Sequence, residues 1–125
     1  MGFHFSTDDG RDFKLNAWSW RPLHEAIAAA GILPAELWEC ASYNNGTPFE
    51  PEEVALLCHF LEKRLLPGLQ PGERRLLNDS VTAEPDDGHF NRAPEDQWLN
   101  YGISYESAAA LLAFLRTTNG RVTIG

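Results

Sequence analysis

Basic residues are scarce in this chain of 125 residues, because ten lysines and arginines stand against eighteen aspartates and glutamates. The formal net charge is -8 at pH 7. Nucleic-acid affinity rests largely on lysine and arginine side chains that neutralise phosphates. We therefore expect no nucleic-acid partner, and a basic protein is the better electrostatic match.

Long apolar runs are also absent. No run approaches the roughly 18 residues that are needed to span a bilayer. The first ten residues, MGFHFSTDDG, have neither the basic start nor the apolar stretch of a signal peptide. We therefore expect a cytoplasmic protein with no membrane association.

Cysteine is rare, with Cys40 and Cys58 alone. Each lies among apolar neighbours in a segment with a helical pattern, which is typical of buried, reduced thiols in a reducing compartment. The histidines are scattered and lack the short ligand spacings of a zinc site. The acidic clusters lack the spacing of a helix-loop-helix calcium site, and no glycine-rich phosphate loop is present. The sequence therefore predicts neither a metal ion nor a cofactor.

Large apolar side chains, in contrast, are plentiful. The chain is 43% hydrophobic and 11% aromatic, which is too rich for a disordered segment despite the net charge. Its length is the commonest for one domain. We expect residues 1–125 to fold as a single domain.

Alternating residues near the two ends of the chain predict strands. Phe3 and Phe5 alternate with polar residues, Asp8-Asp9-Gly10 is a turn signal, and positions 13, 15 and 17 are apolar again. This alternation predicts a hairpin whose second strand runs through Trp18 and reaches Ser19. Residues 121–124 alternate as well, and we expect this strand to pair with the hairpin.

Helical signals fill most of the remaining chain. The expected helices are 21–30 with Pro22 in the first turn and Gly31 as the stop, 34–41, 51–66 and 104–118 with Ser104 as N-cap. Residues 72–79 predict a turn or a short helix, and residues 79–97 predict an exposed acidic loop. The predicted fold is α+β, mostly helical, with a small antiparallel sheet formed by the N-terminal hairpin and the C-terminal strand.

The segment WSWRPLHEA at 18–26 concentrates aromatic and polar side chains. On a continuing strand, Trp18 and Trp20 share a face opposite the apolar residues of the hairpin. Either the strand bends and both indoles close the core, or they form an exposed aromatic contact site. We expect Arg21 to pair with a carboxylate of the acidic loop or to stack on Trp20. His24 is a candidate general base, although no nucleophile or orienting partner is identified for it.

The order of three features resembles that of a small group of uncharacterised bacterial proteins. These features are WSWRPL at 18–23, the Asn-Asn-Gly turn at 44–46 before a glutamate-rich helix, and a last helix that ends in NGRVTI. The resemblance spans nearly the whole chain. It implies no activity and no site residues, because no function is known for the group.

The favoured hypothesis is a protein-binding module without catalysis, for which an immunity-like or inhibitory protein is one version. Its acidic surface would engage a basic partner, since complementary charge speeds association. The candidate binding residues are Trp18, Trp20, Arg21, His24, Asn44, Asn45, Asp86, Asp87, Glu95 and Asp96.

Two alternative functions fit the same sequence. One is a small enzyme or small-molecule-binding protein with a pocket near Trp20, Arg21, His24 and Asn45, where a histidine and a carboxylate would converge. The other is a structural or oligomerising module with an apolar patch, built from Trp18, Trp98 or Tyr101. The sequence names no catalytic residue and does not determine the oligomeric state.

Overall fold

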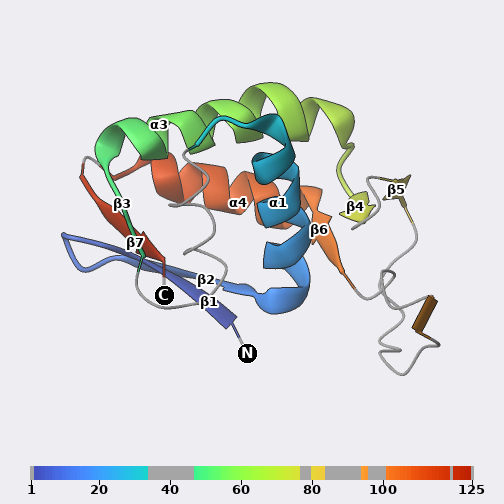
Figure 1. Ribbon diagram of the computed structural model, residues 1–125, viewed down its shortest axis with the longest axis horizontal. Coiled ribbons are helices and arrows are strands. Elements are labelled where there is room, and N and C mark those ends of the chain that lie inside the picture. The colour runs from blue at the N-terminus through green and yellow to red at the C-terminus, as the bar shows by residue number, and fades with distance from the viewer. Residues whose placement is uncertain are drawn as a thin grey trace.

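The computed structural model describes residues 2–33, 47–76, 80–83, 94–95, 101–118 and 120–124. Helices and antiparallel sheets are both present, so the predicted α+β class is confirmed. Figure 1 shows the arrangement: the helices lie on one side of a four-stranded sheet, and a second, three-stranded sheet lies at the far end of the helices. The predicted helix over 34–41 lies outside the described residues.

The four-stranded sheet joins segments from both ends of the chain. Strands β1 (Gly2–Thr7) and β2 (Asp12–Asn16) form the predicted hairpin, with Phe5 opposite Phe13. Strand β7 (Val122–Ile124) pairs antiparallel with β1, as expected, and also with β3 (Thr47–Phe49). The strand order is β2-β1-β7-β3, so the last strand of the chain lies inside the sheet.

Helix α1 (Ala17–Ala30) begins where the second strand was expected to continue. The side-chain oxygen of Asn16 accepts a hydrogen bond from the backbone N–H of Ser19 at 2.8 Å, which caps the first turn. Pro22 therefore lies inside the helix and not at its start. The predicted end is confirmed, because Gly31 has a φ of 66° and its N–H donates to the carbonyl of Ala28 at 3.2 Å.

Helix α3 (Pro51–Phe60) starts at the predicted proline. The Glu53 carboxylate accepts a hydrogen bond from the backbone N–H of Glu50 at 2.9 Å, as part of a capping box. The helix continues through a π-helical turn (Leu61–Leu65) and a 3-10 turn (Leu66–Gly68), and so ends near the predicted boundary. Cys58 is only half-buried, although it was expected in the buried stripe.

Helix α4 (Tyr105–Arg116) confirms the last predicted helix. The Ser104 hydroxyl oxygen accepts a hydrogen bond from the backbone N–H of Ser107 at 3.0 Å, so Ser104 is the N-cap. The helix packs on α3 and contacts β2 of the four-stranded sheet.

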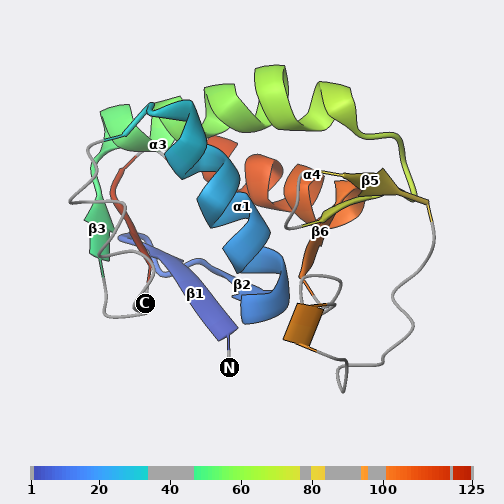
Figure 2. The ribbon, with the colours of Figure 1, turned by 45° about the vertical axis from the view of Figure 1, so that its right-hand side comes forward.

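The three-stranded sheet was not predicted. Its strands are β4 (Arg74–Leu76), β5 (Val81–Thr82) and β6 (Gly102–Ser104), in the order β5-β4-β6. The expectation of a turn or short helix over 72–79 is wrong at β4, and β5 lies within the expected acidic loop. Strand β6 leads directly into α4 and contacts α1, as the second view in Figure 2 shows from another side.

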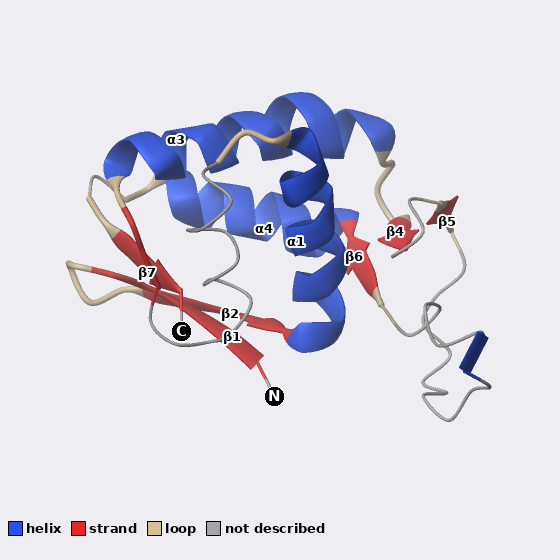
Figure 3. Ribbon diagram, viewed as in Figure 1, coloured by secondary structure: helices blue, strands red, loops and turns tan. Residues whose placement is uncertain are grey.

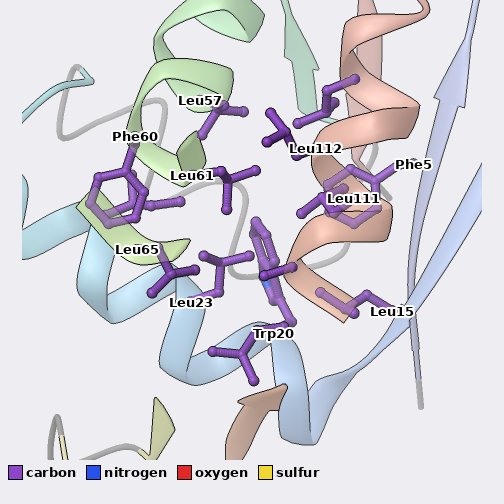
Figure 4. Packing of buried hydrophobic residues seen from close by; sticks show 14 of the residues in the cluster. Phe5, Leu15, Trp20, Leu23, Leu57, Phe60, Leu61, Leu65, Leu111 and Leu112 are labelled. Carbon is purple, nitrogen blue, oxygen red and sulfur yellow. The ribbon is translucent and has the colours of Figure 1, made fainter. Parts of the chain in front are cut away.

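The core lies between the helices and the four-stranded sheet. Figure 4 shows side chains of α1, α3 and its π-helical turn, α4 and the β1–β2 hairpin that point toward one another. The labelled residues are Phe5, Leu15, Trp20, Leu23, Leu57, Phe60, Leu61, Leu65, Leu111 and Leu112. The side chains that α1 contributes to this core fix the inner face of the helix by packing. Figure 3, coloured by secondary structure, shows how the helices and strands are separated.

Candidate functional site

A cleft of about 520 Å³ lies beside helix α1. Arg21, His24, Glu25 and Ala28 line it, and their spacing of i, i+3, i+4 and i+7 places them on one face of the helix. The remaining lining residues are Phe3 of β1, Trp20, and Tyr101 just before β6. Because α1 contacts both β1 and β6, one helix face and two strand ends meet at this cleft.

The inner wall of the cleft is aromatic and buried. Trp20 is 2% exposed and Phe3 is 6% exposed, and their ring centroids are 5.5 Å apart. Trp20 also meets Phe5 edge to face at 5.4 Å. These contacts confirm that Trp20 belongs to the core and exclude it as a fully exposed contact residue. Its packing on both rings holds the inner wall rigid.

His24 lies one helical turn beyond Trp20. Its ring meets the indole of Trp20 edge to face, with centroids 5.7 Å apart. The His24 side chain is half-buried. The imidazole thus rests on an aromatic surface and, as a lining residue, borders the cleft.

Arg21 carries the positive charge of the cleft. Its Nε lies 3.4 Å from a carboxylate oxygen of Glu25, and its Cζ lies 4.9 Å from the ring centroid of Tyr101. These are different partners from the expected loop carboxylate or Trp20, because on a helix Glu25 is the i+4 neighbour of Arg21. Arg21 and Glu25 are 54% and 51% exposed, so both reach the mouth of the cleft.

Four lining residues were not among the candidate binding residues. Glu25 and Ala28 follow from Arg21 by helical spacing, and that signal was available in the sequence. Phe3 and Tyr101 come from distant segments, so no local pattern joins them to the site. Only the packing of α1 against β1 and β6 brings them together.

Most of the other candidate residues fall outside the described part of the chain. Trp18 belongs to the first turn of α1, and its side chain is not described. Glu95 is exposed. The candidates outside the described residues are Asn44, Asn45, Asp86, Asp87 and Asp96.

The described residues carry little surplus charge, with nine lysines and arginines against eleven aspartates and glutamates. Several of these carboxylates form ion pairs, such as Asp9 with Arg11 at 3.5 Å and Glu50 with Arg121 at 2.9 Å. The acidic residues outside the described part are Glu36, Glu39, Asp79, Glu84, Asp86, Asp87 and Asp96, with Arg92 as the one basic residue. The net negative charge therefore belongs mainly to those segments.

Three groups outside the cleft have shifted pKa values. A hydrogen bond from Arg116 lowers the pKa of Glu62, and one from Thr7 lowers the pKa of Asp9. Burial raises the pKa of the Cys58 thiol. The described residues hold no group of three or more histidine, cysteine, aspartate or glutamate side chains that is suited to a metal ion.

A second hollow, of about 200 Å³, is lined by Arg64 and Arg75 with Phe60 and the alanines at 26, 29 and 30. Ligand sites commonly occupy about 300 to 1,000 Å³, so the larger cleft beside α1 is the better candidate. Among the described residues, no helix has the length and apolarity that a membrane crossing requires.

Comparison of this chain with protein-family models, curated proteins and solved structures gives no match.

Proposed function

We propose that this protein binds a small organic molecule in the cleft beside helix α1. The observation that carries the proposal is the cleft itself, in which three aromatic side chains and the charged pair of Arg21 and Glu25 border one volume of about 520 Å³. Small-molecule sites have this character: mostly apolar and aromatic walls with a few placed polar groups.

The buried wall supports a preformed site. Phe3 and Trp20 are held by core packing, and Trp20 contacts a second phenylalanine behind it. A ligand that meets a rigid wall loses less free energy to ordering of the protein than one that must order a loop. The polar groups at the mouth would then orient the ligand.

His24 takes part in the same cleft. It lines the cleft, and its ring meets the indole of Trp20 edge to face, with centroids 5.7 Å apart. Aromatic rings that meet in this way stabilise a contact beyond the burial of apolar area. We therefore assign His24 a binding role.

The hypothesis of an acidic, protein-binding surface stays a prediction. Its loop residues Asp86, Asp87 and Asp96 lie outside the described part of the chain, and the described part is nearly balanced in charge. The cleft is the feature on which described geometry bears directly, so it is the function that we favour.

A neutral fluorescent probe tests the proposal. N-phenyl-1-naphthylamine fluoresces more strongly in apolar surroundings, and we expect saturable enhancement with the wild-type protein. Ala28 lines the cleft and is exposed, so Ala28→Trp adds a large ring to the cleft without overpacking the core. We expect this variant to weaken probe binding by about tenfold or more.

Ala55→Trp is the matched control, because Ala55 is an exposed alanine on α3 and does not line the cleft. This variant should bind the probe as the wild type does. Equal binding by wild type and Ala28→Trp would place the probe elsewhere, and no saturable binding by the wild type would contradict a preformed apolar site.

A further inference from the structure

We infer that the ligand of the cleft is a planar aromatic molecule with a single carboxylate, and that Arg21 binds this carboxylate. The inference rests on the proposed function and adds the chemical class of the ligand. Three observations lead to it: the unused donors of Arg21, the positive charge already placed over Tyr101, and the aromatic inner wall.

The guanidinium of Arg21 has donors to spare. Within the part of the chain that the structure describes, it donates through Nε alone, to Glu25, at a long 3.4 Å. Its two terminal nitrogens make no further hydrogen bond there. The paired N–H groups of a guanidinium match the two oxygens of a carboxylate, so this fork is suited to a bidentate contact.

Two neighbours restrict the position of Arg21. Glu25, one helical turn later, forms an ion pair with the Nε of Arg21. The Cζ of Arg21 lies over the ring of Tyr101, 4.9 Å from its centroid. A cation over an aromatic face is attracted by the negative face of the ring. The fork is therefore partly oriented before a ligand arrives, which lowers the entropy that binding costs.

The same contacts disfavour a cationic ligand. An ammonium group would seek Glu25 and the aromatic faces, but Arg21 already neutralises Glu25 and already lies over Tyr101. A ligand cation would meet like-charge repulsion at both places. A dianion is disfavoured in turn, because the Glu25 carboxylate also borders the cleft. A ligand with a single negative charge is therefore the best complement to the pair of Arg21 and Glu25.

The inner wall determines the rest of the ligand. Phe3 and Trp20 border the cleft but are only 6% and 2% exposed, so a ligand meets a small part of each ring and not a full face. Aromatic rings also interact through edge contacts, which stabilise a complex beyond the burial of apolar area. A flat, rigid aromatic body can make such contacts and loses less conformational entropy on binding than a flexible aliphatic chain.

Three compounds that share a naphthalene ring and differ in charge test the inference. These are 2-naphthoate, its methyl ester, and 2-naphthylmethylamine, each titrated calorimetrically and in competition with N-phenyl-1-naphthylamine. We expect 2-naphthoate to bind the wild-type protein about tenfold more tightly than the ester, since a charge-assisted pair replaces a neutral contact. The amine should bind most weakly.

Arg21→Gln should abolish the preference for the acid and weaken the binding of the ester far less than that of the acid. Arg21→Lys keeps the charge without the fork and should retain only part of the preference. Arg64→Gln is the matched control, because Arg64 is an exposed arginine that lies over a ring, at 5.8 Å from Phe60, outside this cleft. Circular dichroism checks that each variant is folded.

The outcomes separate the two proposals. If the ester binds as tightly as the acid, if the amine binds most tightly, or if Arg21→Gln keeps the preference, the inferred ligand class is wrong and the binding cleft stands. If neither the three compounds nor the neutral probe bind, the proposed function fails and the ligand class fails with it.

Discussion

At the scale of single residues, the helical position of Arg21 determines which side chains it meets at the cleft. On α1, Arg21 faces the residues three, four and seven positions later, so Glu25 is its ion-pair partner. Trp20 is its neighbour in sequence and leaves the helix axis about 100° away, so the expected stacking of Arg21 on Trp20 was wrong. The spacing from Arg21 to Glu25 was present in the helix expected over 21–30, whereas Tyr101 comes from a distant segment that no local pattern joins to the site.

Cys58 gives a prediction at this scale. Burial raises the pKa of its thiol, and the nearby Glu62 carboxylate raises it further, while Arg116 lowers it. Since the thiolate is the reactive form, a raised pKa slows alkylation at neutral pH. In a Cys40→Ser background, we expect iodoacetamide to modify Cys58 more slowly than it modifies a free cysteine peptide at pH 7.5, as followed by mass spectrometry.

Glu62→Gln sharpens this test. The substitution removes one group that raises the pKa of Cys58 and keeps Arg116, which lowers it, so alkylation should become faster. Glu52→Gln on the exposed start of α3 is the comparison and should leave the rate unchanged. A rate for Cys58 equal to that of the free peptide in the parent protein would argue against its burial.

At the scale of elements, caps and alternation were sufficient wherever apolar residues recur at a regular spacing. The hairpin, α3, α4 and β7 lie where alternation, prolines and Ser104 predicted them. The start of α1 was misplaced because Pro22 resembles a first-turn proline, whereas the N-cap is Asn16. Strands β4, β5 and β6 were missed because each holds only one large apolar residue and so shows no alternation, whereas the equally short β7 has Val122 and Ile124 on one face.

The cap of α1 gives a prediction for an element. Asn16 accepts the hydrogen bond from Ser19 that closes the first turn. We expect Asn16→Ala to lower the free energy of unfolding by about 1 kcal/mol, since this is a typical loss for an N-cap. Asn16→Asp keeps an acceptor and should retain nearly all of the stability. Urea denaturation followed by circular dichroism measures both changes.

This experiment also tests the boundary between strand and helix. If the strand continued through Trp18 as the alternation suggested, Asn16 would lie inside a strand and cap no helix, and alanine and aspartate would have similar effects. A clear difference between the two variants is therefore expected only for a helix that begins at Ala17.

At the scale of the whole molecule, β7 unites distant parts of the chain. It lies between β1 and β3, and its Val122 and Ile124 are buried in the core. Thr123 lies between them and is only half-buried, because successive strand residues point to opposite faces. Three residues thus join the hairpin at one end of the sequence to the segment before α3.

Ile124→Ala tests this role. Its side chain is fully buried, and removal of a buried isoleucine side chain to alanine typically costs about 2 to 5 kcal/mol. Thr123→Ala on the same strand should cost much less, because its side chain is half-buried. Thermal unfolding monitored by circular dichroism compares the two. Similar losses for both variants would contradict the assigned faces of β7.

The central place of β7 also affects how the protein is made. Ribosomes synthesise the β1–β2 hairpin early, whereas β7, which covers the other edge of β1, comes last among the strands. An uncovered strand edge is a template for pairing with other chains. A nascent chain is therefore most prone to aggregation between the emergence of the hairpin and the arrival of residues 122–124, and chaperones that shield strand edges would matter most in that interval.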